Sequence, residues 1–151
     1  MNRIDKNNYY LDIAEVVSER GTCLRTNYGA VIVKNDEIIS TGYTGSPRGR
    51  KNCCEVGNCK RNDLNIQSGE RYELCESVHA EMNAIISSDR NKMIDSTLYL
   101  VGICKSDGFY KQNAKPCMIC EKLIINAGIK YVCIRDTKSK YRMIEVKEWI
   151  K

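Results

Sequence analysis

The chain has 151 residues and a formal net charge of +5, with 24 Lys and Arg against 19 Asp and Glu. This length fits one domain with a substantial core. The small positive excess favours a solvated surface over a nucleic-acid footprint, and it would also suit a small anionic substrate. Residues 1–8 are polar, and no apolar run approaches the roughly 20 residues of a membrane span. We therefore expect neither an export signal nor a membrane anchor.

Nine cysteines are a large and odd number for this length. In an exported chain they would indicate disulfides, whereas a chain without an export signal more often uses its thiols for metal ligation or keeps them free. The sequence thus favours a cytoplasmic protein with metal-bound or free thiols.

Helices and strands alternate along the chain. Hydrophobic periodicity and turn residues predict, in order, a helix over 9–19, strands over 28–33 and 37–42 around a turn at 34–36, a loop over 42–49, a helix carrying residue 79, a strand over 97–101, a helix over 116–127 ended by Gly128, a strand over 129–134 and an edge strand over 143–150. This alternation indicates an α/β domain with helices on both faces of a sheet. Residues 50–76 are polar, cysteine-rich and without a clear period, and a loop of that length is usually functional or held by another constraint.

Two short motifs carry the chemistry, His-Ala-Glu at 79–81 and Pro-Cys-Met-Ile-Cys at 116–120. They supply one imidazole and two thiols, which leave a fourth tetrahedral zinc position open, as in catalytic rather than structural sites. The carboxylate of Glu81 can carry a proton without occupying the metal. The pair resembles the H-x-E and P-C-x-x-C signature of zinc nucleobase deaminases.

The spacing also predicts how these residues are placed. Cys117 and Cys120 lie on one face of a helix, and Pro116 suits the first position of that helix. Ser77 suits the N-cap of a second helix that carries His79 in its opening turn. Both sets of ligands would then lie at helix N-termini, where the partial positive charge favours thiolates.

With these elements in order, the chain resembles the zinc-dependent cytidine and deoxycytidylate (dCMP) deaminase superfamily, and most closely the dCMP deaminases, from about residue 9 to residue 134. The resemblance is carried by Thr-Cys-Leu-Arg at 22–25, Gly-Ala-Val-Ile-Val at 29–33, Gly-Tyr-Thr-Gly-Ser-Pro-Arg-Gly at 42–49, Ser-Gly-Glu-Arg-Tyr-Glu-Leu-Cys at 68–75 and Val-His-Ala-Glu-Met-Asn-Ala-Ile at 78–85. It implies a cytidine deaminase-like fold, a three-layer α/β/α sandwich with a central mixed sheet of about five strands. We expect one domain over 1–151, with a cysteine-rich insert at about 50–76.

The resemblance implies that His79, Cys117 and Cys120 bind a catalytic Zn²⁺ and that Glu81 is the catalytic proton shuttle. The expected substrate contacts are Asn27, Thr44, Arg48 and Ala80. Thr44 departs from the pattern, because many relatives have Asn there. The implied reaction is hydrolysis of dCMP to dUMP and ammonia by a zinc-activated water, in pyrimidine nucleotide metabolism. We expect a homo-oligomer, from dimer to hexamer, that binds neither membrane nor nucleic acid.

The remaining cysteines concentrate in or near the insert. A second, closed zinc site would explain both their number and the ordering of a loop that lacks a core, since a metal can supply folding energy that packing cannot. Its expected ligands are Cys23, Cys53, Cys59 and Cys75, with Cys54 as the substitute. The competing interpretation is buried free thiols. Cys104 and Cys133 have no partner at metal spacing and are expected in the core.

Three other functions remain open at this point. A thiol–disulfide redox protein would need a cis-proline loop after its dithiol, but the only prolines are Pro47 and Pro116. A deaminase acting on RNA or single-stranded DNA would share the zinc chemistry and need a basic, aromatic-lined channel. An inactive, zinc-stabilised binding protein would need no proton shuttle, and the intact Glu81 argues against it.

Overall fold

The computed structural model describes residues 2–151, so the first residue of the expected 1–151 domain lies outside the described part. Its centre is a five-stranded sheet in the order β2-β1-β3-β4-β5, formed by β1 (Thr26–Lys34), β2 (Glu37–Tyr43), β3 (Thr97–Cys104), β4 (Tyr131–Arg135) and β5 (Tyr141–Glu145). β3 and β4 are parallel, and the other neighbouring pairs are antiparallel. The predicted mixed sheet of about five strands is confirmed.

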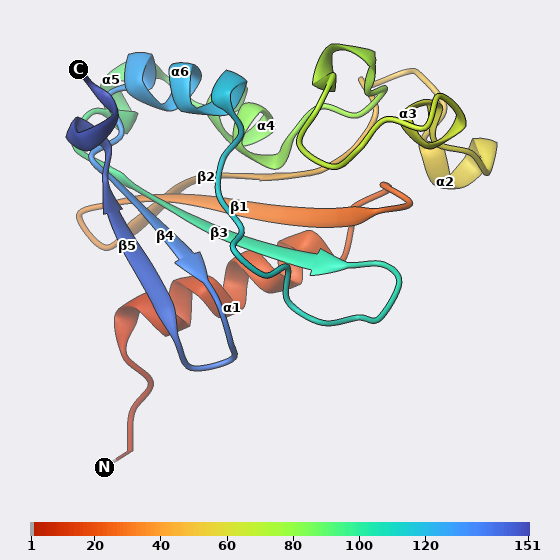
Figure 1. The fold of residues 1–151 in the computed structure, drawn as a ribbon. Helices are drawn as coiled ribbons and strands as arrows, with labels where there is room; N and C mark the ends of the chain where they lie inside the picture. Colours follow the sequence, from red (N-terminus) through yellow and green to blue (C-terminus); the bar gives the residue numbers. More distant parts are fainter. Residues whose placement is uncertain (1) are drawn as a thin grey trace.

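Helices cover both faces of this sheet (Figure 1). On one face lies α1 (Lys6–Ser18), and on the other lie α4 (Ala80–Ile86), α5 (Arg90–Met93) and α6 (Met118–Ala127). Successive strand residues face opposite sides. In β1, Val31 packs in the α1 cluster, whereas Ala30 and Ile32 pack in the cluster with α4 and α6. The three-layer arrangement is thus confirmed, and the α4–α6 side carries the candidate site.

Two glycines allow the helices to approach the sheet closely. A Cβ on Gly29 would lie 2.0 Å from the Ala14 carbonyl oxygen of α1, and one on Gly42 would lie 2.4 Å from the Ala80 carbonyl oxygen of α4. Both distances are shorter than any real contact, so any larger residue would push a helix outward. At Gly42 this close approach places the first turn of α4 directly against β2.

The cysteine-rich segment 50–76 lies beyond one end of the sheet (Figure 1). It contains two single-turn helices, α2 (Cys53–Val56) and α3 (Lys60–Asp63), and the 3₁₀ turn η1 (Tyr72–Leu74). The oxygen Oδ1 of Asn52 accepts hydrogen bonds from the Thr22 hydroxyl at 3.0 Å and from the Ser46 N–H at 3.2 Å. Short helices and side-chain contacts therefore order this segment, in place of a core of its own.

Some predicted boundaries differ from the structure. The first helix begins three residues before the predicted residue 9, because the Asp5 carboxylate caps it by accepting the Asn8 N–H at 3.2 Å. The last predicted strand, 143–150, is wrong at its end, since β5 stops at Glu145 and the chain continues as the 3₁₀ turn η2 (Val146–Trp149). The turn occurs because Val146 and Trp149 pack back against the core on the α6 side. Within residues 2–151, no helix combines the length and apolar character that a membrane crossing needs.

Candidate metal centre and substrate cavity

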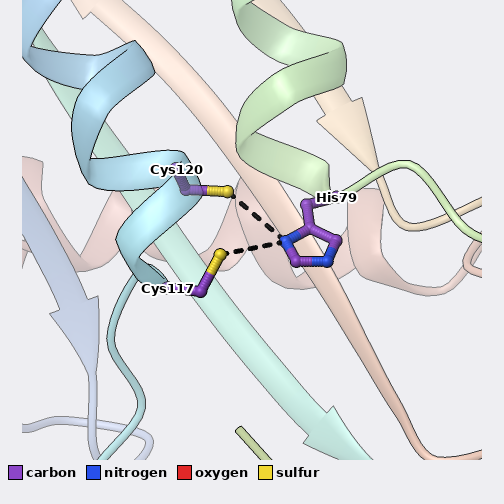
Figure 2. Close-up of side chains that lie close together, drawn as sticks. All are labelled: His79, Cys117 and Cys120. Carbon is purple, nitrogen blue, oxygen red and sulfur yellow. Dashed lines mark hydrogen bonds between the residues drawn. The ribbon is translucent and has the colours of Figure 1, made fainter. Parts of the chain in front are cut away.

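Three predicted ligands converge between the first turns of α4 and α6. Nδ1 of His79 lies 3.5 Å from Sγ of Cys117 and 3.4 Å from Sγ of Cys120. Figure 2 shows both sulfur atoms pointing toward that ring nitrogen. Among residues 2–151 this is the only group of three or more His, Cys, Asp or Glu side chains whose ligand atoms all lie within 4.8 Å of one another.

The geometry of this group fits Zn²⁺. A tetrahedral zinc with bonds of about 2.3 Å to sulfur and about 2.0 Å to nitrogen places the two ligand atoms about 3.5 Å apart. The nitrogen–sulfur distances of 3.4 and 3.5 Å match this value. One imidazole and two thiols also leave a fourth position for water, as a catalytic zinc requires.

Extended residues just before the helices present the ligands. The strand-like bridge between Gly45 and Val78 keeps the chain extended, so α4 begins at Ala80 with His79 as its N-cap. The predicted cap at Ser77 is therefore wrong, and the Ser77 hydroxyl lies instead 4.0 Å from Sγ of Cys53.

The second helix also begins later than predicted. Cys117 is extended, with ψ 169°, and caps α6, while its carbonyl oxygen accepts the Glu121 N–H at 2.9 Å. Pro116 consequently precedes the helix and does not occupy its first position. Cys117 as the cap and Cys120 in the first turn still place both thiols on the same side, as the spacing predicts.

The cluster has the electrostatics of two coupled thiols beside an imidazole. Hydrogen bonding from Cys120 lowers the pKa of the Cys117 thiol to about 4, with a further contribution from His79. The same contact with Cys117, together with burial, raises the pKa of Cys120. Burial opposes the charged form of His79, but the contact with Cys117 and the charge of Glu81 raise its pKa overall. A divalent metal would stabilise both thiols as thiolates.

The Glu81 carboxyl is almost completely buried, with 4% of the residue exposed. Burial raises the pKa of Glu81, and its own backbone N–H and the nearby His79 only partly oppose this shift. A carboxyl that exchanges a proton nearer to neutral pH is suited to general acid–base work. Glu81 thus has both the position and the environment of a proton shuttle.

A cavity of about 380 Å³ opens onto the cluster and is lined by His79, Glu81 and Cys117. Its cationic lining residues are Arg25, Arg61, Lys111 and Lys115. Glu81 is the only carboxylate in the lining. The volume is within the roughly 300–1,000 Å³ typical of small-molecule sites, and the charge suits an anion.

The expected substrate contacts lie in different surroundings. Thr44 lines the cavity, but its Oγ1 accepts the Tyr28 N–H at 3.0 Å. The Asn27 amide bonds to the Cys23 backbone, accepting at 2.8 Å and donating at 3.1 Å, and it lies outside the cavity lining. Ala80 is fully buried, and Arg48 is exposed and outside the lining. Only Thr44 of the four lines the cavity.

The four cysteines expected at a second metal are less closely grouped than the His79, Cys117 and Cys120 cluster. Their thiols do not form a group within 4.8 Å among residues 2–151. Burial raises the pKa of Cys53, the contact with Ser77 lowers it, and the charges of the other three thiols add smaller increases, so these thiols lie near Cys53. Cys23 and Cys75 also line the substrate cavity.

Sequence reasoning missed several cavity residues, among them Arg61, Tyr72, Lys111 and Lys115. Tyr72 was part of the 68–75 stretch that carried the resemblance, but no spacing rule distinguished it. The two lysines lie between β3 and α6, where no periodic pattern identifies single residues. Only the folded chain brings them to the cavity.

Comparison with known proteins agrees with this site. The chain matches the family described as "Cytidine and deoxycytidylate deaminase zinc-binding region" over residues 4–135. It is 34% identical over 137 residues to the deoxycytidylate deaminase of Mycobacterium phage D29, covering 87% of this chain and 95% of that protein. It is 31% identical over 124 residues to the deoxycytidylate deaminase of Schizosaccharomyces pombe, where the match covers 82% of this chain but spans 35% of the relative.

Solved structures show the same fold. The dCMP deaminase of cyanophage S-TIM5, solved in complex with dCMP and dUMP, matches with a TM-score of 0.61 and 26% identity, covering 89% of this chain and 85% of that one. The cytidine deaminase of Burkholderia pseudomallei matches with a TM-score of 0.62 at 15% identity, covering 96% and 95%, and supports the fold alone. With its His-x-Glu and Cys-x-x-Cys motifs joined at one cavity, the chain belongs to the zinc-binding cytidine and deoxycytidylate deaminase family.

Proposed function

We propose that this chain is a zinc-dependent hydrolase that converts dCMP to dUMP and ammonia in pyrimidine nucleotide metabolism. One observation carries the proposal: a single cavity is lined by two of the three metal ligands, His79 and Cys117, by the buried Glu81 and by several cations. The relatives named for dCMP deamination, including a phage protein of nearly the same length, support the same substrate.

The roles of the residues follow from their positions. His79, Cys117 and Cys120 would hold Zn²⁺, which would supply a Lewis acid able to lower the pKa of a water toward about 7. Glu81 takes a proton from the attacking water and delivers it to N3 of cytosine. The C4–O bond forms, the C4–N bond breaks, and Glu81 transfers the second proton of the water to the departing amine. One water is consumed and one ammonia released.

Arg25 is the strongest candidate for holding the phosphate. Its Nη1 is buried without a hydrogen-bond partner in the described chain, and its side chain lines the cavity. No ion pair within residues 2–151 involves Arg25, Lys111 or Lys115. An unpaired guanidinium can bind phosphate through charge-assisted, often bidentate bonds. The 5′-phosphate of the substrate would supply the partner that the protein lacks.

Arg25→Gln and Arg48→Gln form a matched test of phosphate recognition. We expect Arg25→Gln to raise KM for dCMP by at least about ten-fold, since losing a hydrogen bond to a charged group costs about 1.5–3 kcal/mol. Deoxycytidine, which has no phosphate, should lose little in kcat/KM. If Arg48→Gln impairs dCMP more than Arg25→Gln does, the phosphate contact lies on the 42–49 loop.

The substrate class is tested by assaying dCMP, CMP, deoxycytidine, dCTP and a cytosine oligonucleotide on the same preparation. We expect dCMP to have the highest kcat/KM. An oligonucleotide that equals or exceeds dCMP would replace this proposal with a deaminase acting on single-stranded nucleic acid. Deoxycytidine as the best substrate would instead indicate a nucleoside deaminase.

We also propose a second, structural Zn²⁺ held by Cys23, Cys53, Cys59 and Cys75. Their mutual proximity around Cys53 and the absence of a core in the 50–76 segment support it. Metal analysis should give about two zinc ions per chain, and a stoichiometry of one in unchelated protein would refute this site.

A homo-oligomer in the cytosol is the remaining part of the proposal. Large apolar side chains are exposed on neighbouring helices, namely Ile86 of α4 and Met118, Ile119 and Leu123 of α6. Exposed apolar side chains that gather on one surface commonly mark an interface between protein chains. Within residues 2–151 no cysteine forms a disulfide, which suits a reducing compartment. Light scattering coupled to gel filtration should give a mass of two to six chains, and a Met118→Glu variant should reduce it.

A further inference from the structure

An aromatic ring from the cysteine-rich segment packs directly on the metal centre. The rings of Tyr72 and His79 lie with centroids 5.0 Å apart and planes at 86°. This edge-to-face arrangement is the favoured geometry of aromatic pairs. Tyr72 belongs to η1, so the contact joins the segment 50–76 to a residue at the start of α4.

Only one of the two ring nitrogens of His79 has a hydrogen-bond partner among the described residues. Its ring hydrogen bonds within residues 2–151 both use Nδ1, the atom that faces Cys117 and Cys120. Metal-binding histidines are usually oriented by a hydrogen bond from the other ring nitrogen to a carboxylate, carbonyl or water. In this chain the described protein partner on the remaining ring surface is the aromatic ring of Tyr72.

Tyr72 is in turn held by a buried cation. Arg61 is 5% exposed, and its Cζ lies 4.5 Å from the centroid of the Tyr72 ring. Its Nε donates to the Glu70 carbonyl oxygen at 3.0 Å and its Nη2 to the Gln67 carbonyl oxygen at 2.8 Å. A buried guanidinium is stable only when its donors are satisfied. These carbonyl groups and the aromatic face therefore fix one geometry for Arg61 and close the chain around it.

We propose that Arg61 and Tyr72 are positioning residues that transmit the folded state of the segment 50–76 to the imidazole of His79. They hold the ring plane in which Nδ1 faces the two thiols, and so they increase the affinity of this site for Zn²⁺. Because coupling between two equilibria is reciprocal, a metal at His79 also stabilises the segment. The proposal concerns metal binding, so its test is independent of the substrate.

The decisive comparison is Tyr72→Phe against Tyr72→Leu. Phenylalanine keeps the ring, and the Tyr72 hydroxyl makes no hydrogen bond to the described residues, so zinc affinity should stay within about two-fold of wild type. Leucine removes the ring and should weaken zinc binding by about 10–100-fold, the usual effect of losing a residue that orients a ligand. Affinity is measured by chelator competition, and the same variants carrying His79→Ala report any metal bound elsewhere.

Arg61 is tested with a matched control. Arg61→Met should weaken zinc binding in the same direction as Tyr72→Leu. Lys130→Met is the control: Nζ of Lys130 lies 5.4 Å from the centroid of the Tyr131 ring in β4. Removing this cation should leave zinc affinity unchanged. Equal zinc affinity for Tyr72→Leu and wild type, or equal weakening by Tyr72→Phe and Tyr72→Leu, overturns the proposal.

A second measurement needs no variant of the segment. Cys117→Ser removes a ligand but keeps the His79 ring, so cleavage by protease within 50–76 should become several-fold faster than in the zinc-loaded wild type. An unchanged cleavage rate would show that metal and segment are uncoupled, and would overturn the reciprocal part of the proposal even if Tyr72→Leu failed to fold.

Discussion

Two thiol-rich regions of the chain differ in the structure that supports them. Cys117 and Cys120 lie at the start of α6, a helix whose residue Ile124 is completely buried against the sheet. Cys53 is the first residue of the single-turn helix α2, and Cys59 is the N-cap of the single-turn helix α3. Side-chain contacts hold the segment that contains both. The first thiols already lie at metal-binding distance from His79, whereas the second group does not converge as closely. Helices packed on a sheet can preorganise a metal site, whereas the second zinc proposed above would have to order its own ligands as it binds.

The largest effect on activity should come from Glu81, which lies beside the cluster of His79, Cys117 and Cys120. Glu81→Gln keeps the shape of the side chain but cannot carry a proton, so kcat should fall by about 10²–10⁴-fold or more. Zinc content and thermal stability should remain close to wild type, which distinguishes lost chemistry from lost structure. Near wild-type turnover by Glu81→Gln, measured as loss of the cytosine amine, would show that another group moves the proton.

Removing one thiol from each region separates their roles. Cys117→Ser and Cys59→Ser should each lower the zinc content from about two ions per chain to about one. Activity should vanish in Cys117→Ser but largely persist in Cys59→Ser, because only the former holds the reacting site. Both variants should speed proteolysis within 50–76, so activity is the measurement that distinguishes them. Equal losses of activity would mean that the second region also serves the chemistry.

Stability should distinguish the regions as clearly as metal binding does. Leu11 of α1 is fully buried, so Leu11→Ala should lower the free energy of unfolding by about 2–5 kcal/mol. Leu64, in the cysteine-rich segment, is 55% exposed. Leu64→Ala should therefore change the free energy of unfolding by no more than about 0.5 kcal/mol. Urea unfolding of both variants checks this contrast, and similar values for the two would refute it.

The smallest expected effects come from the residues that start helices. Asp5→Ala removes the cap of α1 and should cost about 1 kcal/mol of global stability. Asn52→Ala removes the acceptor for Thr22 and Ser46 and should leave global unfolding almost unchanged while speeding amide exchange within 50–76. A global loss as large for Asn52→Ala as for Asp5→Ala would mean that the segment unfolds together with the sheet.

The sequence by itself determined the elements and the catalytic ligands. Continuous apolar runs, buried on both faces of the sheet, indicated the central strands β1 and β3. The turn at 34–36 is confirmed, with Asn35 and Asp36 at positive φ, as a tight hairpin requires. His79 and Glu81 are two residues apart, and Cys117 and Cys120 are three apart. Such short separations fix relative geometry once a helix begins nearby, so the motif could be identified without the fold.

Only the tertiary structure decided the rest, because these features join residues that are distant in the chain. The helix starts at Ala80 and Met118 depend on what holds the preceding residues extended, as the bridge from Gly45 to Val78 does. The contact of Arg61 with Tyr72, and of Tyr72 with His79, arises when the segment folds over the cavity. Single cations such as Arg25 have no periodic pattern in the sequence, and the fold alone decides which of them remains unpaired beside the metal.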